Sequence, residues 1–212
     1  MITLHHLNHS RSQRVLWLLE EIGKPYEVVN YQRDAVTNLA PPALKAVHPL
    51  GKSPVITDDG LVVAESGLII DYLIRRHGDG RFAPASDMAS PDFVAYQHWL
   101  HFAEGSAMLP LMLKLYVGRL GEAGAPLAPR IEGELHNHFA YIEAALQGRE
   151  YFVGDALTGA DIQMSFVFEA GSLRGPLSDY PNMDAFLTRI QSRPAYQRAL
   201  AVGGPYRFAR QA

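Results

Sequence analysis

A turn rich in hydroxyl groups near the N-terminus has the residue types needed to hold an anion or a thiolate. Asn8, Ser10 and Ser12 lie where a short apolar segment gives way to a helical pattern. A helix start exposes unpaired N–H groups and the positive end of the helix dipole, which both favour negative charge. A serine there is ordinarily an N-cap. Alternatively, its hydroxyl donates to a ligand thiolate, whose pKa a helix start also lowers.

A second candidate site, Ser53-Pro54, immediately precedes a predicted strand. X-Pro bonds adopt the cis form far more readily than other peptide bonds, and a cis bond would turn the preceding backbone outward. The N–H and C=O of Ser53 can then pair with an extended peptide. Alternatively, the proline only protects an edge strand from aggregation. The dipeptide alone does not decide between these interpretations.

A third candidate site, Glu65-Ser66, opens a predicted helix. The Ser66 N–H and hydroxyl can bind a carboxylate, and Glu65 can pair with an ammonium group. An amino acid presents both charges side by side. The alternative is an ordinary helix cap followed by a favourable first turn.

Taken together, the three sites describe one ligand: a thiol-bearing peptide with a free amino-acid head. The chain has 0 Cys, which excludes a cysteine nucleophile, a thiolate metal site and dithiol redox chemistry. Any thiol chemistry therefore takes its sulfur from a ligand.

The first eighty residues predict the elements that position these sites. Ile2–His6 reads as a strand, a helical pattern runs from Arg14 to a stop at Gly23, and residues 26–31 form a second strand. A short helix after Pro41-Pro42 precedes a strand at residues 55–57. Asp59-Gly60 predicts a hairpin, and a helix follows from Glu65 to near His77. This order is typical of an α/β domain.

The second half of the chain predicts helices alone. A polar stretch at residues 81–90 separates a domain at 1–80 from one at 91–212. Residues 93–120 form a long helical pattern that Pro110 should kink. Further helices are predicted at 131–146, at 183–192 and from Thr158, where Thr158 and Asp161 have capping-box spacing.

Composition and charge exclude several classes of protein. The net charge of −3 over 212 residues gives no electrostatic basis for binding nucleic acid or an anionic membrane. Apolar runs are too short for a membrane span, and the first residues predict no signal or transit peptide. We therefore expect a cytoplasmic protein.

Three segments in combination resemble the cytosolic glutathione transferases, closest to their serine-type bacterial and fungal branch. They are residues 7–21 (LNHSRSQRVLWLLEE), 48–56 (HPLGKSPVI) and 64–67 (AESG), and the resemblance continues to Thr158-Gly159-Ala160-Asp161-Ile162. It implies a thioredoxin-like α/β domain that binds glutathione, an all-α domain, and a two-fold homodimer with a role in detoxification.

The resemblance also implies a role for individual residues. Ser10, four residues before Arg14, matches the serine that hydrogen-bonds the glutathione thiolate, with Asn8 and Ser12 as alternatives. The matched glutathione-binding positions are Lys52, Ser53, the cis-proline Pro54, Glu65 and Ser66. Glu104 is a candidate for completing the site of the partner subunit, and Met112 and Tyr116, with Tyr206 and Phe208, for lining an acceptor pocket. The expected reaction is conjugation of glutathione to a small hydrophobic electrophile, with peroxide reduction as a further activity.

Two other functions compete with this one. His5, His6 and His9 suggest a metal site, but His5 and His6 should point to opposite faces of a strand, and no carboxylate lies at ligand spacing. We therefore expect no metal. The same fold also serves as a non-catalytic binding or assembly module, in which the peptide clamp persists while thiol activation is lost.

Overall fold

The computed structural model describes residues 1–173 and 177–210. Contacts divide the chain into two compact units, which are Met1–Ala83 together with Ile190–Ala212, and Pro84–Arg189. The first unit therefore takes in the end of the chain, a segment that the sequence pattern had grouped with the helical domain.

The first unit is built on a four-stranded sheet. Its strands are β1 (Ile2–Leu7), β2 (Tyr26–Tyr31), β3 (Val55–Asp58) and β4 (Leu61–Ala64), in the order β2-β1-β3-β4. β1 and β2 are parallel, and the other two pairs are antiparallel. The hairpin predicted at Asp59-Gly60 is confirmed, with φ values of 49° and 87° that suit the left-handed turn favoured between antiparallel strands.

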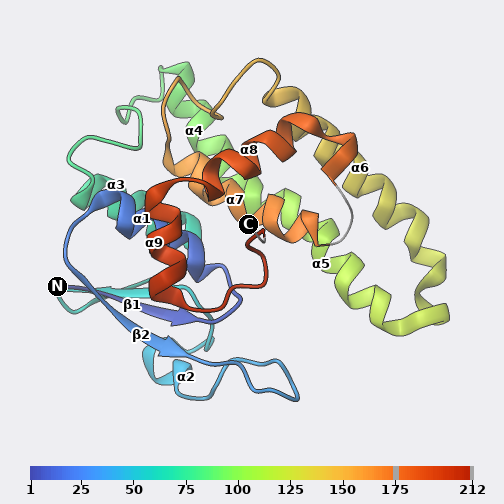
Figure 1. Cartoon of the computed structure of the whole chain (residues 1–212), viewed down its shortest axis with the longest axis horizontal. Coiled ribbons are helices and arrows are strands. Elements are labelled where there is room, and N and C mark those ends of the chain that lie inside the picture. The colour runs from blue at the N-terminus through green and yellow to red at the C-terminus, as the bar shows by residue number, and fades with distance from the viewer. Residues whose placement is uncertain (174–176, 211–212) are drawn as a thin grey trace. The chain divides into compact units, whose positions relative to one another are not determined.

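Four helices accompany this sheet: α1 (Ser12–Ile22), α2 (Leu44–Val47), α3 (Ser66–His77) and α9 (Pro194–Gly203). α1, α3 and α9 lie on one side of the sheet and α2 on the other (Figure 1). Nine of the 11 residues of α1 are buried, because the helix packs against β1, α3 and α9. Its predicted stop is confirmed at Gly23, which has a φ of 76° and donates its N–H to the Leu19 carbonyl at 2.9 Å.

The end of α9 approaches α1 too closely for a side chain. A Cβ at Gly203 would lie 2.8 Å from Oε1 of Gln13, 3.0 Å from Cδ2 of Leu16 and 3.2 Å from Nε2 of His6. All three are core residues, so they have little room to withdraw. Glycine at this position lets α9 cover the start of α1.

We expect Gly203→Val to lower the free energy of unfolding by about 1 to 3 kcal/mol, because the added methyl groups overpack this contact. Denaturant unfolding measures the loss. Ala201→Val is the matched control, since it adds the same kind of side chain to the same helix at an exposed position and should cost under about 1 kcal/mol. Equal losses in the two variants would contradict the close approach.

In the described residues of the second unit, helices are the only regular secondary structure. It contains α4 (Pro91–Phe102), α5 (Met108–Val117), α6 (Ala128–Ala145), α7 (Gly159–Ser172) and most of α8 (Pro181–Gln191), with 3-10 segments at Gly118–Leu127 and Leu177–Asp179. The break predicted at Pro110 occurs earlier, in a π-helical turn at Ala103–Ala107. The backbone stays helical from this turn into α5. A proline ring displaces the carbonyl four residues before it, and for Pro110 that residue is Ser106, within the π-helical turn. The helix also ends at Val117, short of the predicted residue 120.

α7 is the most buried helix of this unit, and its predicted capping box at Thr158 and Asp161 is confirmed. The Asp161 carboxylate is fully buried and accepts from the N–H of Thr158 at 2.7 Å, the hydroxyl of Thr158 at 2.8 Å and the N–H of Phe152 at 2.8 Å. One side chain thus starts the helix and fixes the loop before it. In the described part of the chain, no helix combines the length and apolar character needed to cross a bilayer.

Candidate active site

Strand register brings the three sequence-predicted sites to one end of the sheet. His5 of β1 pairs with Val55 of β3, which pairs in turn with Ala64 of β4. The Ser10 turn leaves β1 just beyond this row, Ser53-Pro54 enters β3 just before it, and Glu65-Ser66 follows β4 directly. Segments more than fifty residues apart therefore meet at a single edge.

Ser10 has a structural role in the turn. Its Oγ accepts from the N–H of Ser12 at 3.2 Å, and its hydroxyl donates to the Leu7 carbonyl at 2.8 Å. The N-cap position of α1 is Arg11, without a side-chain cap, so Ser10 is not the N-cap. The residue before it, His9, has a φ of 50°, in the left-handed region that non-glycine residues seldom adopt. The side chain of Ser10 is mostly buried.

Ser12 is hydrogen-bonded to an imidazole that sequence reasoning did not connect with it. Its fully buried Oγ lies 2.9 Å from Nδ1 of His6 and 2.8 Å from Oγ of Ser10. The His6 ring also bonds the backbone of Gly203, and Nε2 is the ring atom beside that residue. Burial, the largest cause, lowers the pKa of His6 to about 4, which keeps the ring neutral near pH 7.

The direction of this hydrogen-bond chain follows from counting hydrogens. A neutral His6 that donates from Nε2 to a backbone carbonyl must accept at Nδ1. The Ser12 hydroxyl lies 2.9 Å from Nδ1 and 3.2 Å from the Leu7 carbonyl. Among the described residues it is the group placed to supply the hydrogen that Nδ1 accepts, so we assign its hydrogen to the nearer imidazole. The Ser10 hydrogen, which bonds the Leu7 carbonyl, is the one that can rotate toward a ligand.

Asn8 is fixed by a residue beyond β2. The backbone N–H of Arg33 donates to Asn8 Oδ1 at 2.8 Å, and Nε of Arg33 donates to the Asn8 carbonyl at 3.2 Å. With Oδ1 engaged, the Asn8 amide nitrogen is the end of the side chain that carries hydrogens. Asn8 therefore stays an alternative donor at this turn.

The Ser53–Pro54 bond is cis, as the family resemblance implied. The Ser53 hydroxyl donates to the His5 carbonyl at 2.8 Å and so joins the loop to β1. Among the residues that the structure describes, the Ser53 N–H and C=O make no backbone hydrogen bond. They are thus the backbone groups with which an extended peptide can form hydrogen bonds. Lys52 is exposed beside them.

Glu65 and Ser66 begin α3 with an unusual backbone. Glu65 is exposed and has a φ of 71° and a ψ of 116°, a strained conformation for a non-glycine residue. Ser66 is buried, and its Oγ accepts from Nη2 of Arg14 at 2.6 Å.

Arg14 was noted in the sequence only for its spacing from Ser10, yet it ties α1 to the start of α3. Only 2% of its side chain is exposed. A charged residue flanked by the apolar run of a buried helix is the signal that could have revealed this role.

The histidines at the start of the chain have separate partners. His5 Nδ1 lies 3.1 Å from the Tyr31 hydroxyl, whereas His6 contacts Ser12. Within the described ranges, no group of three His, Asp or Glu side chains is arranged to hold a metal ion.

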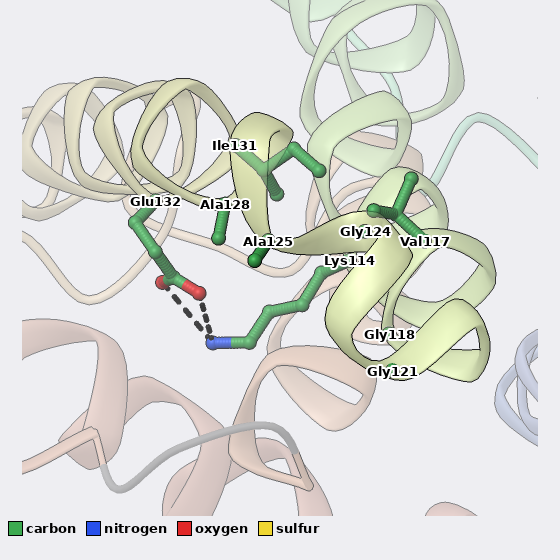
Figure 2. Close-up of a pocket in the computed structure, with 9 residues that line it drawn as sticks. All are labelled: Lys114, Val117, Gly118, Gly121, Gly124, Ala125, Ala128, Ile131 and Glu132. Carbon is green, nitrogen blue, oxygen red and sulfur yellow. Dashed lines mark hydrogen bonds and ion pairs between the residues drawn. The ribbon is translucent and has the colours of Figure 1, made fainter.

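The remaining predicted residues lie in the helical unit. Glu104 is half-buried in the π-helical turn, Met112 is half-buried in α5, and Tyr116 is 57% exposed. A cavity of about 280 Å³ opens where α5, the 3-10 segment and α6 meet, with the Lys114–Glu132 ion pair, 2.9 Å long, on its wall (Figure 2). Mostly glycine and alanine line it, and neither Met112 nor Tyr116 does.

Comparison with known families identifies the two parts of the chain. The chain matches the N-terminal domain model of glutathione S-transferases over residues 1–75 and the C-terminal domain model over residues 92–194. It therefore belongs to the glutathione S-transferase family, with the family's thioredoxin-like and helical domains, and is a glutathione transferase.

Individual relatives agree with this membership. The chain is 36% identical to glutathione S-transferase 3 of Schizosaccharomyces pombe, over 92% of this chain and 85% of that protein. It is 33% identical to glutathione S-transferase 1 of Saccharomyces cerevisiae, over 97% of this chain and 98% of that protein. The crystal structure of a glutathione S-transferase from Actinobacillus pleuropneumoniae superimposes with a TM-score of 0.89 at 36% identity, over 100% of this chain and 97% of that one.

Proposed function

We propose that Ser10 holds the thiol of bound glutathione as a thiolate, which places the enzyme in the serine-type branch. The Ser10 hydrogen rotates from the Leu7 carbonyl to the sulfur, while the Ser12 N–H keeps its bond to Oγ. The start of α1 adds the positive end of the helix dipole. Thiols at helix starts lose one to several pKa units, each worth about 1.4 kcal/mol.

The peptide part of glutathione is held by the other two sites. Ser53 pairs with the cysteinyl backbone beside Pro54, and Lys52 contributes a positive charge. Ser66, oriented by Arg14, binds the γ-glutamyl carboxylate, and Glu65 binds its ammonium group. Pairing along the backbone fixes the position of the sulfur, so the thiolate and the acceptor are held together rather than colliding by diffusion.

The second substrate is a small hydrophobic electrophile, which the thiolate attacks at carbon with loss of a leaving group or addition to a double bond. A hydroperoxide is the alternative: attack at oxygen breaks the O–O bond and releases an alcohol, and a second glutathione reduces the resulting sulfenic acid to the disulfide and water. Met112 and Tyr116 are the proposed acceptor contacts, and a homodimer in which Glu104 of the partner subunit completes the glutamyl clamp is the proposed assembly. A cytoplasmic role in detoxification follows from the same proposal.

The observation that supports this function most is the meeting of all three predicted sites at one edge. The hydrogen count strengthens it, because it assigns Ser12 to His6 and leaves the Ser10 hydroxyl for the ligand. Two non-glycine residues with positive φ, His9 and Glu65, stand directly before the proposed ligand residues Ser10 and Ser66. Such backbone strain is typical of functional sites.

Binding and turnover, measured on one preparation, separate the enzyme from a binding module. We expect calorimetry to show glutathione binding, and conjugation to 1-chloro-2,4-dinitrobenzene to exceed the uncatalysed rate. Binding without turnover of this or any other electrophile or hydroperoxide would identify a non-catalytic module. Absence of glutathione binding would contradict both functions.

A further inference from the structure

The last described segment of the chain contacts the turn that bears Ser10. The backbone N–H of Arg207 donates to Nδ1 of His9 at 3.2 Å. The two residues are 198 positions apart, and both belong to the unit that holds the sheet. The contact therefore connects the two ends of the chain within one compact body.

The C-terminal segment, residues 204–210, is anchored on both sides of Arg207. Tyr206 and Phe208 are buried. The side-chain amide of Gln191 donates to the Phe208 carbonyl at 3.3 Å and accepts from the N–H of Arg210 at 3.0 Å. Since these contacts fix the backbone before and after Arg207, its N–H is presented in a defined direction.

His9 needs such support, because its φ of 50° is unfavourable for a residue with a Cβ. The preceding residue, Asn8, is held by Arg33. Two consecutive residues of the turn are thus clamped from different parts of the chain, and Ser10 follows them immediately.

The contact also requires a neutral imidazole, since Nδ1 must accept a hydrogen. The groups that face the ring are cationic or neutral: Arg207, Arg33 and the neutral His6. Burial first, and then the two arginines, lower the pKa of His9. At neutral pH the ring is therefore in the form that can accept the Arg207 N–H.

We propose that His9 is a positioning residue through which the C-terminal segment holds the thiol-binding turn in the conformation that presents Ser10. The inference rests on the proposed role of Ser10. It makes residues 204–210 part of the thiol site, although nearly two hundred positions separate them from Ser10 in the sequence.

A matched pair of variants at His9 tests this. Asparagine tolerates positive φ and places Oδ1 where the imidazole has Nδ1, whereas alanine has no acceptor. We expect His9→Ala to lower kcat about tenfold and to raise the pKa of the bound thiol by about one unit. His9→Asn should have a kcat and a thiol pKa close to those of the wild type. Affinity for S-methylglutathione, whose sulfur cannot ionise, should stay within about twofold in both variants.

A second pair acts on the other partner. Arg207→Pro removes the N–H, whereas Arg207→Ala keeps it, and both remove the guanidinium group. We expect the proline variant to have the higher thiol pKa of the two. Equal thiol pKa values within both pairs would overturn the role of His9, provided that the wild-type enzyme forms a thiolate. If the wild type binds glutathione without forming a thiolate, the proposed function itself fails.

Discussion

Replacement of Ser10 by alanine is expected to lower kcat/KM for glutathione conjugation by about 10²-fold. Losses of this size are typical when an active site loses one hydrogen-bond donor to an anion, which here is the glutathione thiolate. The hydroxyl is the donor that can rotate from the Leu7 carbonyl to the sulfur. Steady-state kinetics at neutral pH measures the loss. Binding of S-methylglutathione should change little, because the peptide is held elsewhere.

Ser12→Ala is the matched control, since it removes the neighbouring hydroxyl 2.8 Å away. Its main effect should be on stability: Nδ1 of His6 and the N–H of Leu7 lose their partner, at a cost of about 1 to 3 kcal/mol. If instead Ser12→Ala loses the activity and Ser10→Ala keeps it, the assignment of the two serines is reversed.

Asp161→Ala is expected to have the largest effect on stability, lowering the free energy of unfolding by about 3 to 5 kcal/mol. The substitution leaves the buried N–H groups of Phe152 and Thr158 without an acceptor, and each such group costs about 1 to 3 kcal/mol. Chemical denaturation measures the loss. Asp155→Ala, at an exposed position in the preceding loop, should change stability by less than about 0.5 kcal/mol.

The contribution of Asp161 should also depend on pH in an unusual direction. Burial raises the pKa of its carboxyl from 3.8 to about 6, so between these values the native state binds more protons than the unfolded state. Stability therefore falls as pH rises from about 4 to about 6, by about 3 kcal/mol for this group. Asp161→Asn does not titrate, and the difference in stability from wild type should shrink across that window. A constant difference would contradict the raised pKa.

Local patterns in the sequence were enough to predict the elements of the first eighty residues, but not α9, which belongs to the same unit. The apolar spacing of α1, the stop at Gly23 and the Asp59-Gly60 hairpin depend on neighbouring residues only, and all three are confirmed. The three site motifs were found for the same reason, because each stands at the start of a helix or strand that has its own local signal.

Contacts between distant segments were not predictable in this way. Nothing near α9 indicates that it packs on α1, nor that Gly203 must be small for that contact. The bonds from Ser12 to His6 and from Arg207 to His9 depend on tertiary packing. Pro110 was predicted to kink a long helix, but the form of the interruption was not predicted: the backbone stays helical and passes through a π-helical turn at Ala103–Ala107, just before the proline.

The ionisation of bound glutathione tests the central claim most directly. The ultraviolet absorbance of the thiolate, titrated against pH with wild-type enzyme and with Ser10→Ala, gives the pKa of the bound thiol. We predict a value of about 6 to 7 for the wild type and a return toward the ordinary thiol value of about 8.5 in the variant. Equal pKa values in the two proteins, at saturating glutathione, would contradict the role of Ser10 in holding the thiolate.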